Sequence, residues 1–226
     1  MKVAIIPARG GSKRIPKKNI KTFFGKPMIH YPLKAASDSN LFEKIVVSSD
    51  DDEILEVASG FSQSIDCFKR SASLSDDFTP TLPVVQDYIL SEKENIDDLC
   101  CIYPCTPFLD SKILRDFYKE YTRDKSFFYF PVAEFPSSIF RALELSKDGT
   151  LSPVFKENVN KRTQDLNSSY FDAGQFYIGS KEKWLSENSN IHSSAKAMVV
   201  SRLLAVDIDD TDDWDYAENL YKNNVL

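Results

Sequence analysis

KVAIIPARGGSKRIPKKN, residues 2–19, joins a short apolar run to a basic loop that contains two adjacent glycines. The run KVAIIP has the length and composition of a buried strand. Apolar residues at helical spacing follow from near Pro27, at Met28, Ile29, Leu33 and Ala36. The order of strand, basic loop and helix predicts the first unit of an α/β fold.

This order repeats along the chain. The expected strands are 44–48, 65–68, 99–103 and 127–132, and the expected helices between them are 51–59, 82–94 and 110–121. Strands that are apolar on both faces and separated by helices are typical of a parallel sheet. We expect the parallel pattern to resume at 175–178, 197–201 and 205–208, before a last helix at about 212–222. The sequence therefore predicts a mainly parallel sheet flanked by helices.

The pattern changes after about residue 135. A hairpin signal, Lys147-Asp148-Gly149, separates FRALEL from TLSPVF. We interpret residues 1–226 as a single domain, with a small β-rich insertion or dimerisation arm at about 135–165.

The composition is that of an ordinary globular protein: 226 residues, 42% hydrophobic and 27% charged, with 7 glycines and 11 prolines. No apolar run approaches the length of a membrane span, and the start MKVAIIPARG lacks the pattern of a signal peptide, so we expect a cytoplasmic protein without a membrane partner. We expect reduced, buried thiols at Cys67, Cys100, Cys101 and Cys105. Cys100 and Cys101 should face opposite sides of a strand, which argues against a shared metal.

Charge is distributed unevenly. Residues 1–26 hold eight basic side chains and no acidic one, whereas residues 207–226 hold seven carboxylates and one lysine. The net charge of -6 argues against general nucleic-acid binding. The two segments could serve one ligand, a polyphosphate with a divalent cation, or could be two solvated surfaces.

In an open parallel sheet, ligands bind beyond the carboxyl ends of the strands, where the basic loop lies. Gly10-Gly11 offers backbone that can approach a ligand, and the loop supplies cationic donors at Arg9, Lys13, Arg14, Lys17 and Lys18. The next glycine is Gly25, so neither the dinucleotide fingerprint nor the P-loop motif is present. Dinucleotide oxidoreductases and P-loop kinases are therefore disfavoured.

Asp207 and Asp209 are two apart in an expected strand, so their side chains should share one face while Val206 and Ile208 occupy the other. Two such carboxylates, about 7 Å apart at Cα, can converge on one Mg2+ that also binds phosphate oxygens. The acids that follow, Asp210, Asp212 and Asp213, are expected to cap the last helix or to be solvated.

Two other classes of function remain to be compared. The sequence from Asp207 to Thr211 also satisfies D-x-D-x-T, the nucleophile motif of haloacid-dehalogenase-type phosphatases, but in that family it ends the first strand, whereas here 15 residues follow it. A non-catalytic nucleotide sensor would keep the basic loop without needing the acidic pair. His30 and His192 lie in no arrangement that suggests a catalytic triad, and we expect structural or solvated roles for both.

Five motifs, in order, give the chain a family resemblance: IPARGGSKRIPKKNI, VVSSDDDEI, KRSASLSDDFTPT, YPCTPFL and VDIDDTDDW. Together they resemble the cytidylyltransferases that activate nine-carbon keto-acid sugars, the sialic acid synthetase family, which implies a Rossmann-like nucleotidyltransferase fold. The segment QDLNSSYFDAGQFYIG is most similar to members that use pseudaminic acid, because enzymes for ordinary sialic acid carry Asn-Gly where this chain has Ala173-Gly174.

The resemblance implies roles for individual residues. Catalytic contacts with the phosphates fall to Arg9, Lys13 and Lys18, and the nucleotide site as a whole comprises Ala8, Arg9, Gly10, Gly11, Ser12, Lys13, Lys18, Asn19, Arg70, Thr79 and Thr81. The sugar site comprises Tyr103, Arg162, Gln164, Ala173 and Tyr177, and the metal ligands are Asp207 and Asp209. Many relatives have Gln at the position of Tyr103. Arg162 is suited to the sugar carboxylate, with a surface ion pair as the alternative.

The implied reaction uses CTP and Mg2+. The anomeric hydroxyl of the sugar attacks the α-phosphorus and expels pyrophosphate, and no covalent nucleophile or identified base is required. Pseudaminic acid is the expected sugar and N-acetylneuraminic acid the alternative. The resemblance also implies a homodimer in which the arm reaches the partner.

Overall fold

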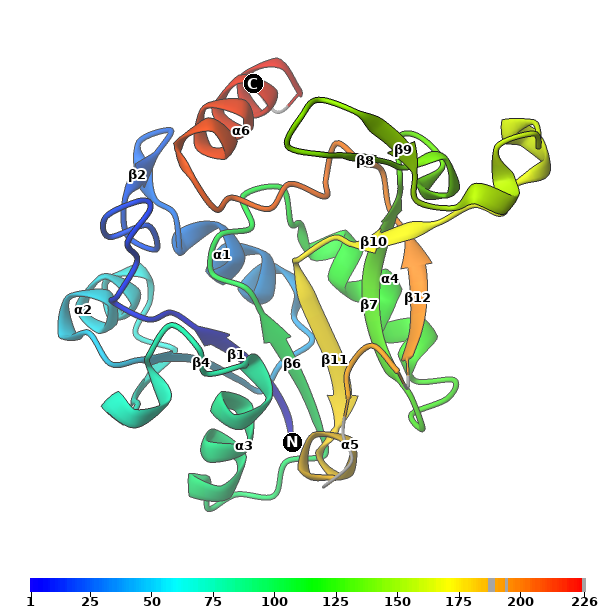
Figure 1. The fold of residues 1–226 in the computed structure, drawn as a ribbon. Coiled ribbons are helices and arrows are strands. Elements are labelled where there is room, and N and C mark those ends of the chain that lie inside the picture. Colours follow the sequence, from blue (N-terminus) through cyan, green and yellow to red (C-terminus); the bar gives the residue numbers. More distant parts are fainter. Residues whose placement is uncertain (187–189, 194, 225–226) are drawn as a thin grey trace.

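The computed structural model describes residues 1–186, 190–193 and 195–224. In this part of the chain eight strands form one sheet in the order β10-β7-β11-β6-β1-β4-β5, with β12 paired to β7 (Figure 1). The strands are β1 (Lys2–Pro7), β4 (Lys44–Ser49), β5 (Ile65–Lys69), β6 (Asp98–Ile102), β7 (Phe128–Glu134), β10 (Tyr170–Asp172), β11 (Phe176–Ser180) and β12 (Ala195–Val199). A separate two-stranded ribbon joins β2 (Thr22–Phe23) to β3 (Lys26–Pro27).

The direction of the strands follows the prediction in one half of the sheet. β1 is parallel to β4 and β6, and β4 is parallel to β5. β12 is parallel to β7, but β11 is antiparallel to both β6 and β7, and β10 is antiparallel to β7. The expectation that 175–178 resumes the parallel pattern is therefore wrong. The chain leaves β7 through the arm and returns beside β7 without a helical crossover, so β10 and β11 run opposite to β7.

Helices cover both faces of the sheet. On one face α1 (His30–Ser39), α2 (Asp52–Phe61) and α4 (Ser111–Tyr121) pack on Ala4 and Ile6 of β1. On the other, α3 (Thr81–Ser91) and α5 (Lys181–Leu185) pack on Val3 and Ile5. Successive β1 residues thus belong to different cores, as expected for a strand buried on both faces.

The four cysteines are free thiols. Cys100 belongs to the first of these cores and Cys101 to the second, which confirms that they face opposite sides of β6. Cys105 is partly buried, whereas Cys67 is exposed, so the prediction of a buried thiol is wrong for Cys67. Cys67 lies on β5, which in the described part of the chain is an edge strand paired with β4 alone.

A third core joins the basic loop and the β2–β3 ribbon to the C-terminal segment. Ile15, Phe23, Met28 and Phe108 pack with Val206, Ile208, Trp214 and Ala217, the last two on α6 (Thr211–Asn224). Residues 205–208 do not form the expected strand; they cross from β12 to α6 without a pairing partner (Figure 1). Their side chains alternate nevertheless, because the third core buries Val206 and Ile208.

The arm is a hairpin of β8 (Leu143–Leu145) and β9 (Leu151–Pro153), followed by a projecting segment (Figure 1). The predicted turn is confirmed: Gly149 adopts a φ of +86°, which favours glycine. Large apolar side chains of the arm are exposed, at Leu143, Leu145, Leu151, Val154 and Val159. In the described residues, no helix combines the length and apolarity that crossing a bilayer requires.

Asp98 joins α4 to the start of β6. Its buried carboxylate accepts hydrogen bonds from the Tyr118 hydroxyl at 2.6 Å, the Tyr121 hydroxyl at 2.7 Å and Lys125 Nζ at 2.6 Å. Burial acts to raise the pKa of Asp98, but these three donors outweigh it and hold the pKa below its ordinary value.

Asp98→Ala should lower the free energy of unfolding by about 2 to 4 kcal/mol at pH 7, since it leaves three buried or half-buried donors without their acceptor. Because the folded-state pKa is depressed, this stabilisation is present above the ordinary carboxyl pKa of about 4 and is lost as the pH falls through the folded-state value. Urea unfolding at several pH values measures the effect. A difference between wild type and variant that stays constant into acid would contradict the assignment.

Candidate active site

A cavity of about 590 Å3 lies at the carboxyl ends of the central strands. Arg9 follows β1, Arg70 follows β5 and Tyr103 follows β6, so each strand delivers a side chain to the same edge of the sheet. Eleven of the predicted site residues line this cavity: Arg9, Ser12, Lys13, Lys18, Asn19, Arg70, Thr79, Thr81, Tyr103, Asp207 and Asp209.

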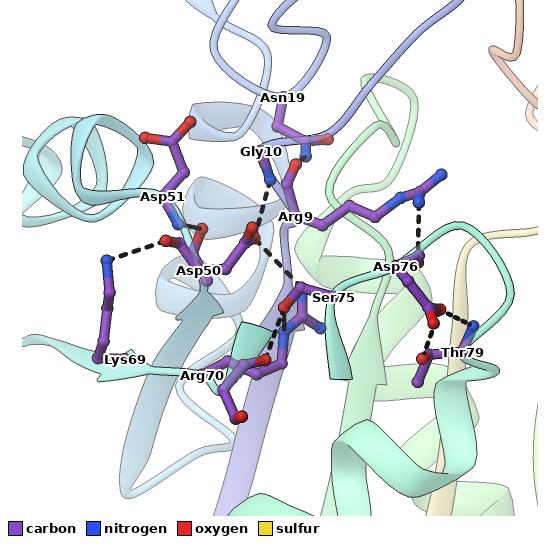
Figure 2. Close-up of polar contacts among 12 residues, drawn as sticks. Arg9, Gly10, Asn19, Asp50, Asp51, Lys69, Arg70, Ser75, Asp76 and Thr79 are labelled. Atoms are coloured by element: carbon purple, nitrogen blue, oxygen red, sulfur yellow. Dashed lines mark hydrogen bonds and ion pairs between the residues drawn. The ribbon is translucent and has the colours of Figure 1, made fainter. Parts of the chain in front are cut away.

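Three predicted nucleotide residues do not line it. Ala8 is buried and donates its N–H to Ser48 O at 2.9 Å, which fixes the start of the basic loop. Gly10 packs against the residue that caps α2: a Cβ there would lie 2.7 Å from Asp51 Oδ2 (Figure 2). Its N–H donates to Asp50 Oδ1 at 3.0 Å. The missing side chain of Gly10 is thus explained by packing within the protein, while Gly11 has open space around its Cα.

One acidic residue holds two of the predicted phosphate-binding cations. Arg9 Nη1 donates to Asp77 Oδ1 at 2.6 Å and to Asp76 O at 2.9 Å, and Lys13 also pairs with Asp77. Lys13 first, and then Arg9, lower the pKa of Asp77. Asp77 therefore stays charged and neutralises the basic loop on this side of the cavity.

A second acidic residue joins the basic loop to the C-terminal acidic segment. Asp209 pairs with Arg14 Nη2 at 3.0 Å and with Lys18 Nζ at 3.5 Å, and Lys18 Nζ also donates to Ile208 O at 2.5 Å. Desolvation raises the pKa of the neighbouring Asp207 carboxyl, and the charge of Asp209 adds to this effect. The two oppositely charged segments thus meet in one cavity.

The acidic pair can supply part of a metal site. Asp207 and Asp209 both line the cavity with carboxylate oxygens, the donors that Mg2+ prefers. Within residues 1–186, 190–193 and 195–224, no group of three or more His, Cys, Asp or Glu side chains could hold a metal on its own. The pair fits a Mg2+ that takes its other ligands from water and substrate phosphates, as Mg2+ commonly does.

Two nearly buried polar side chains form the floor of the cavity. Asn19 Nδ2 donates to Arg9 O at 2.9 Å, and Cys105 Sγ donates to Asn19 Oδ1 at 3.3 Å. Arg70 Nε donates to Ser75 Oγ at 3.1 Å, while its ion-pair partner Asp50 is 3.9 Å away (Figure 2). Burial lowers the pKa of Arg70, so this guanidinium would gain from an anionic or strongly accepting ligand.

Some of the predicted sugar residues lie at or beside the cavity, and others lie on the arm. Tyr103 lines the cavity, and the buried Tyr177 packs against it with ring centroids 5.5 Å apart. Ala173 is buried beside Gly174, which lines the cavity. Arg162 and Gln164 lie on the exposed arm, where Arg162 Nε pairs with Asp165 at 2.9 Å, and a single chain does not bring them to the cavity. Their contact with a sugar stays a prediction.

Several residues around the cavity were not singled out from the sequence. Asp76 and Asp77 lie inside the motif KRSASLSDDFTPT, which was a signal for them, but nothing in the sequence shows that Asp77 pairs with the basic loop. His192, expected to be structural or solvated, contacts Asp172 near the cavity wall.

Comparison with known proteins decides the family. The family model described as Cytidylyltransferase matches residues 3–226, nearly the whole chain. The chain belongs to this family. Family membership therefore favours cytidylyl transfer over a phosphatase as the explanation of the Asp207 motif, and over a non-catalytic nucleotide sensor as the explanation of the basic loop.

Relatives of this cytidylyltransferase include enzymes for two kinds of sugar. The pseudaminic acid cytidylyltransferase of Campylobacter jejuni subsp. jejuni serotype O:2 is 40% identical over 225 residues, covering 98% of this chain and 97% of the relative. The N-acylneuraminate cytidylyltransferase A of Danio rerio is 32% identical over 220 residues, covering 95% of this chain and 49% of the relative.

Solved structures support the fold. CMP:2-keto-3-deoxy-manno-octonic acid synthetase, solved with CTP, aligns with a TM-score of 0.71 at 14% identity and covers 98% of each chain. A 4-diphosphocytidyl-2C-methyl-D-erythritol synthase from Anaerococcus prevotii aligns with a TM-score of 0.64 at 12% identity. The predicted Rossmann-like nucleotidyltransferase architecture is confirmed.

Asp77→Asn should tighten CTP binding by at least about 3-fold, because the triphosphate would no longer compete with a carboxylate for Arg9 and Lys13. Asp116→Asn, which removes the same charge from the exposed face of α4, is the matched control and should leave CTP affinity unchanged. Calorimetric titration with CTP measures both. Equal or weaker binding by Asp77→Asn would show that Asp77 does not oppose the triphosphate.

Proposed function

We propose that this protein transfers CMP from CTP to the anomeric hydroxyl of a nine-carbon keto-acid sugar, pseudaminic acid, and releases pyrophosphate. The observation that carries the proposal is the meeting of the basic loop with Asp207 and Asp209 in one cavity at the carboxyl ends of the strands. Such a cavity suits a polyphosphate with a divalent cation. The similarity to pseudaminic acid cytidylyltransferases supports the choice of sugar.

Arg9, Lys13 and Lys18 bind the triphosphate and neutralise the charge that develops on the departing pyrophosphate. Catalysis then rests on positioning and electrostatics, not on a covalent intermediate with the protein. Cys105 is the thiol that lines the cavity, and burial raises its pKa to about 12, so it stays protonated at neutral pH. A protonated thiol is a poor nucleophile, which agrees with direct transfer.

Asn19, Arg70, Thr79 and Thr81 surround the cytidine. Arg70 and Asn19 are held at about one-twentieth exposure, so their polar groups are pre-oriented before the nucleotide binds. The Thr81 hydroxyl lies 2.9 Å from the Tyr103 hydroxyl at the start of α3. These contacts fix the nucleotide relative to Tyr103, on the side of the cavity that we assign to the sugar.

Asp207 and Asp209 would hold Mg2+, which would supply positive charge to the phosphate oxygens at the reacting centre. Asp209 also pairs with Arg14 and Lys18, so metal binding would draw this carboxylate away from two cations of the basic loop.

The protein acts as a homodimer through the arm at residues 135–165. Leu143, Leu145 and Leu151 are each more than half exposed on a hairpin that has little other surface to cover them. Exposed apolar patches of this kind mark interaction surfaces. Association would also bring the projecting Arg162 and Gln164 against a second chain.

The preferred sugar is decided beside Gly174. Ala173 is almost fully buried next to Gly174, which lines the cavity, so this part of the protein has no asparagine amide to offer hydrogen bonds. A site without that amide suits a sugar with fewer hydroxyl groups, since an unpaired polar group in a buried site costs about 1 to 3 kcal/mol. Pseudaminic acid, a dideoxy diacylamino sugar, meets this condition better than N-acetylneuraminic acid.

With CTP limiting, the kcat/KM for pseudaminic acid should exceed that for N-acetylneuraminic acid by at least about 10-fold. Competition between the sugars, with the CMP-sugars separated by mass, measures the ratio, and parallel reactions with ATP, GTP and UTP test the base. Equal use of both sugars would overturn the substrate assignment alone. Pyrophosphate release that needs no keto-acid sugar would overturn the proposed reaction.

A further inference from the structure

Asp172, the last residue of β10, gathers three donors. Its Oδ1 accepts the Gly174 N–H at 2.9 Å, and its Oδ2 accepts the Tyr177 hydroxyl at 2.7 Å and lies 2.8 Å from His192 Nε2. Under a quarter of the Asp172 side chain is exposed. One carboxylate therefore links the turn before β11, a buried tyrosine on β11 and a histidine that lies between α5 and β12.

The proton positions in this group follow from the inventory of donors. An ionised carboxylate only accepts hydrogen bonds, so His192 must carry its hydrogen on Nε2. The imidazole also packs edge to face on Phe130, with centroids 5.4 Å apart, and on Tyr177, at 6.1 Å. Asn190 Oδ1 accepts the backbone N–H of His192 at 3.0 Å, which orients the backbone that carries the ring. The aromatic contacts and the Asn190 hydrogen bond together hold His192 against Asp172.

The group reaches the cavity through two of its contacts. Gly174 lines the cavity and adopts a φ of +63°, and Asp172 Oδ1 holds this turn through its N–H. A Cβ on Gly174 would lie 3.8 Å from Asp207 Cγ, so the turn faces the acidic pair. Tyr177 supports Tyr103, whose ring lines the cavity. A change at Asp172 would therefore move both Gly174 and Tyr103, the two residues of this group that line the cavity.

Simple stabilisation does not account for His192. Its side chain is 63% exposed, so removing it uncovers little apolar surface and leaves the sheet intact. Instead, the Nε2 hydrogen of His192 occupies one acceptor position on Asp172 and disperses the negative charge of this carboxylate beside Tyr177. Without that donor, Asp172 Oδ2 would have only the Tyr177 hydroxyl, and the wall would lose its link to the segment before β12.

We propose that Asp172 and His192 are positioning residues for the keto-acid sugar, acting through Tyr177 and the Gly174 turn. The inference rests on the proposed function and deepens it by adding a pair that sets affinity for the sugar and not for the nucleotide. The nucleotide contacts proposed above, at Arg9, Asn19 and Arg70, belong to other loops and make none of these hydrogen bonds.

His192→Ala should raise the KM for the sugar by about 10-fold and leave the Kd for CTP within about 2-fold of wild type. His192→Gln, whose amide N–H can donate to Asp172, should recover most of the loss. The control is His30→Ala, which removes a histidine bonded to Val57 O on α2 and should change neither constant. Calorimetry with CTP alone gives the Kd, and pyrophosphate release at saturating CTP gives the KM.

The outcomes separate the two proposals. If wild type binds CTP and uses a keto-acid sugar but His192→Ala leaves the sugar KM unchanged, the positioning role is wrong and the proposed function stands. If His192→Ala weakens CTP and sugar equally, or if His192→Gln is as impaired as His192→Ala, the pair is a general structural support and the inference fails. Absence of sugar-dependent pyrophosphate release by wild type would instead refute the proposed function.

Discussion

The burial of Val206 and Ile208 against Ile15 and Phe23 is the contact on which the rest of the site depends. It joins the loop after the first strand to the segment before the last helix, nearly 200 residues later. Burying side chains of this size contributes about 1.5 to 3 kcal/mol each, enough to hold together two segments with little regular structure. Once the apolar side chains face inward, Asp207 and Asp209 must face the cavity, where Lys18 and Arg14 lie.

Ion pairs within the protein offset much of the charge in the cavity. Two acidic residues next to the basic loop have cationic partners: Asp77 pairs with Arg9 and Lys13, and Asp209 pairs with Arg14 and Lys18. A triphosphate with a divalent cation can replace most of these pairs. Phosphates would take over the cations of the loop and a metal would take over Asp209, which leaves Asp77 as the carboxylate that competes with the triphosphate. Binding is therefore an exchange of partners between charges that the fold has already placed.

Local patterns in the sequence predicted the parts of this arrangement that depend on alternation. The apolar run of β1 located the basic loop, and the spacing of Val206 and Ile208 gave the correct side-chain directions although no strand forms there. Side-chain direction needs only an extended backbone with one face buried, whereas a strand also needs a neighbour with free backbone groups. For the same reason the reversal of β11 was missed: its apolar composition is compatible with either direction.

Contacts between distant loops could not be predicted in this way. Asp77 and Lys13 are more than 60 positions apart, with β2, β3, α1, β4, α2 and β5 between them, and their meeting depends on how the ends of β1 and β5 lie in the sheet. The same holds for His192 and Asp172, which come together because β12 and β10 both pair with β7. The arm is the opposite case. Its hairpin was evident from the turn residues, but the position of Arg162 relative to the sugar depends on what covers the arm.

The most direct test of the account is the affinity of Asp209→Asn for CTP, measured by calorimetry with and without Mg2+. If Asp209 pairs with the loop cations in the empty cavity and with the metal in the loaded one, the substitution has opposite effects under the two conditions. Without Mg2+ the variant should bind CTP more tightly than wild type, because Lys18 and Arg14 are released; with Mg2+ it should bind more weakly. Mg2+ tightening CTP binding equally in both proteins would contradict the claim that the basic loop and the acidic segment form one site.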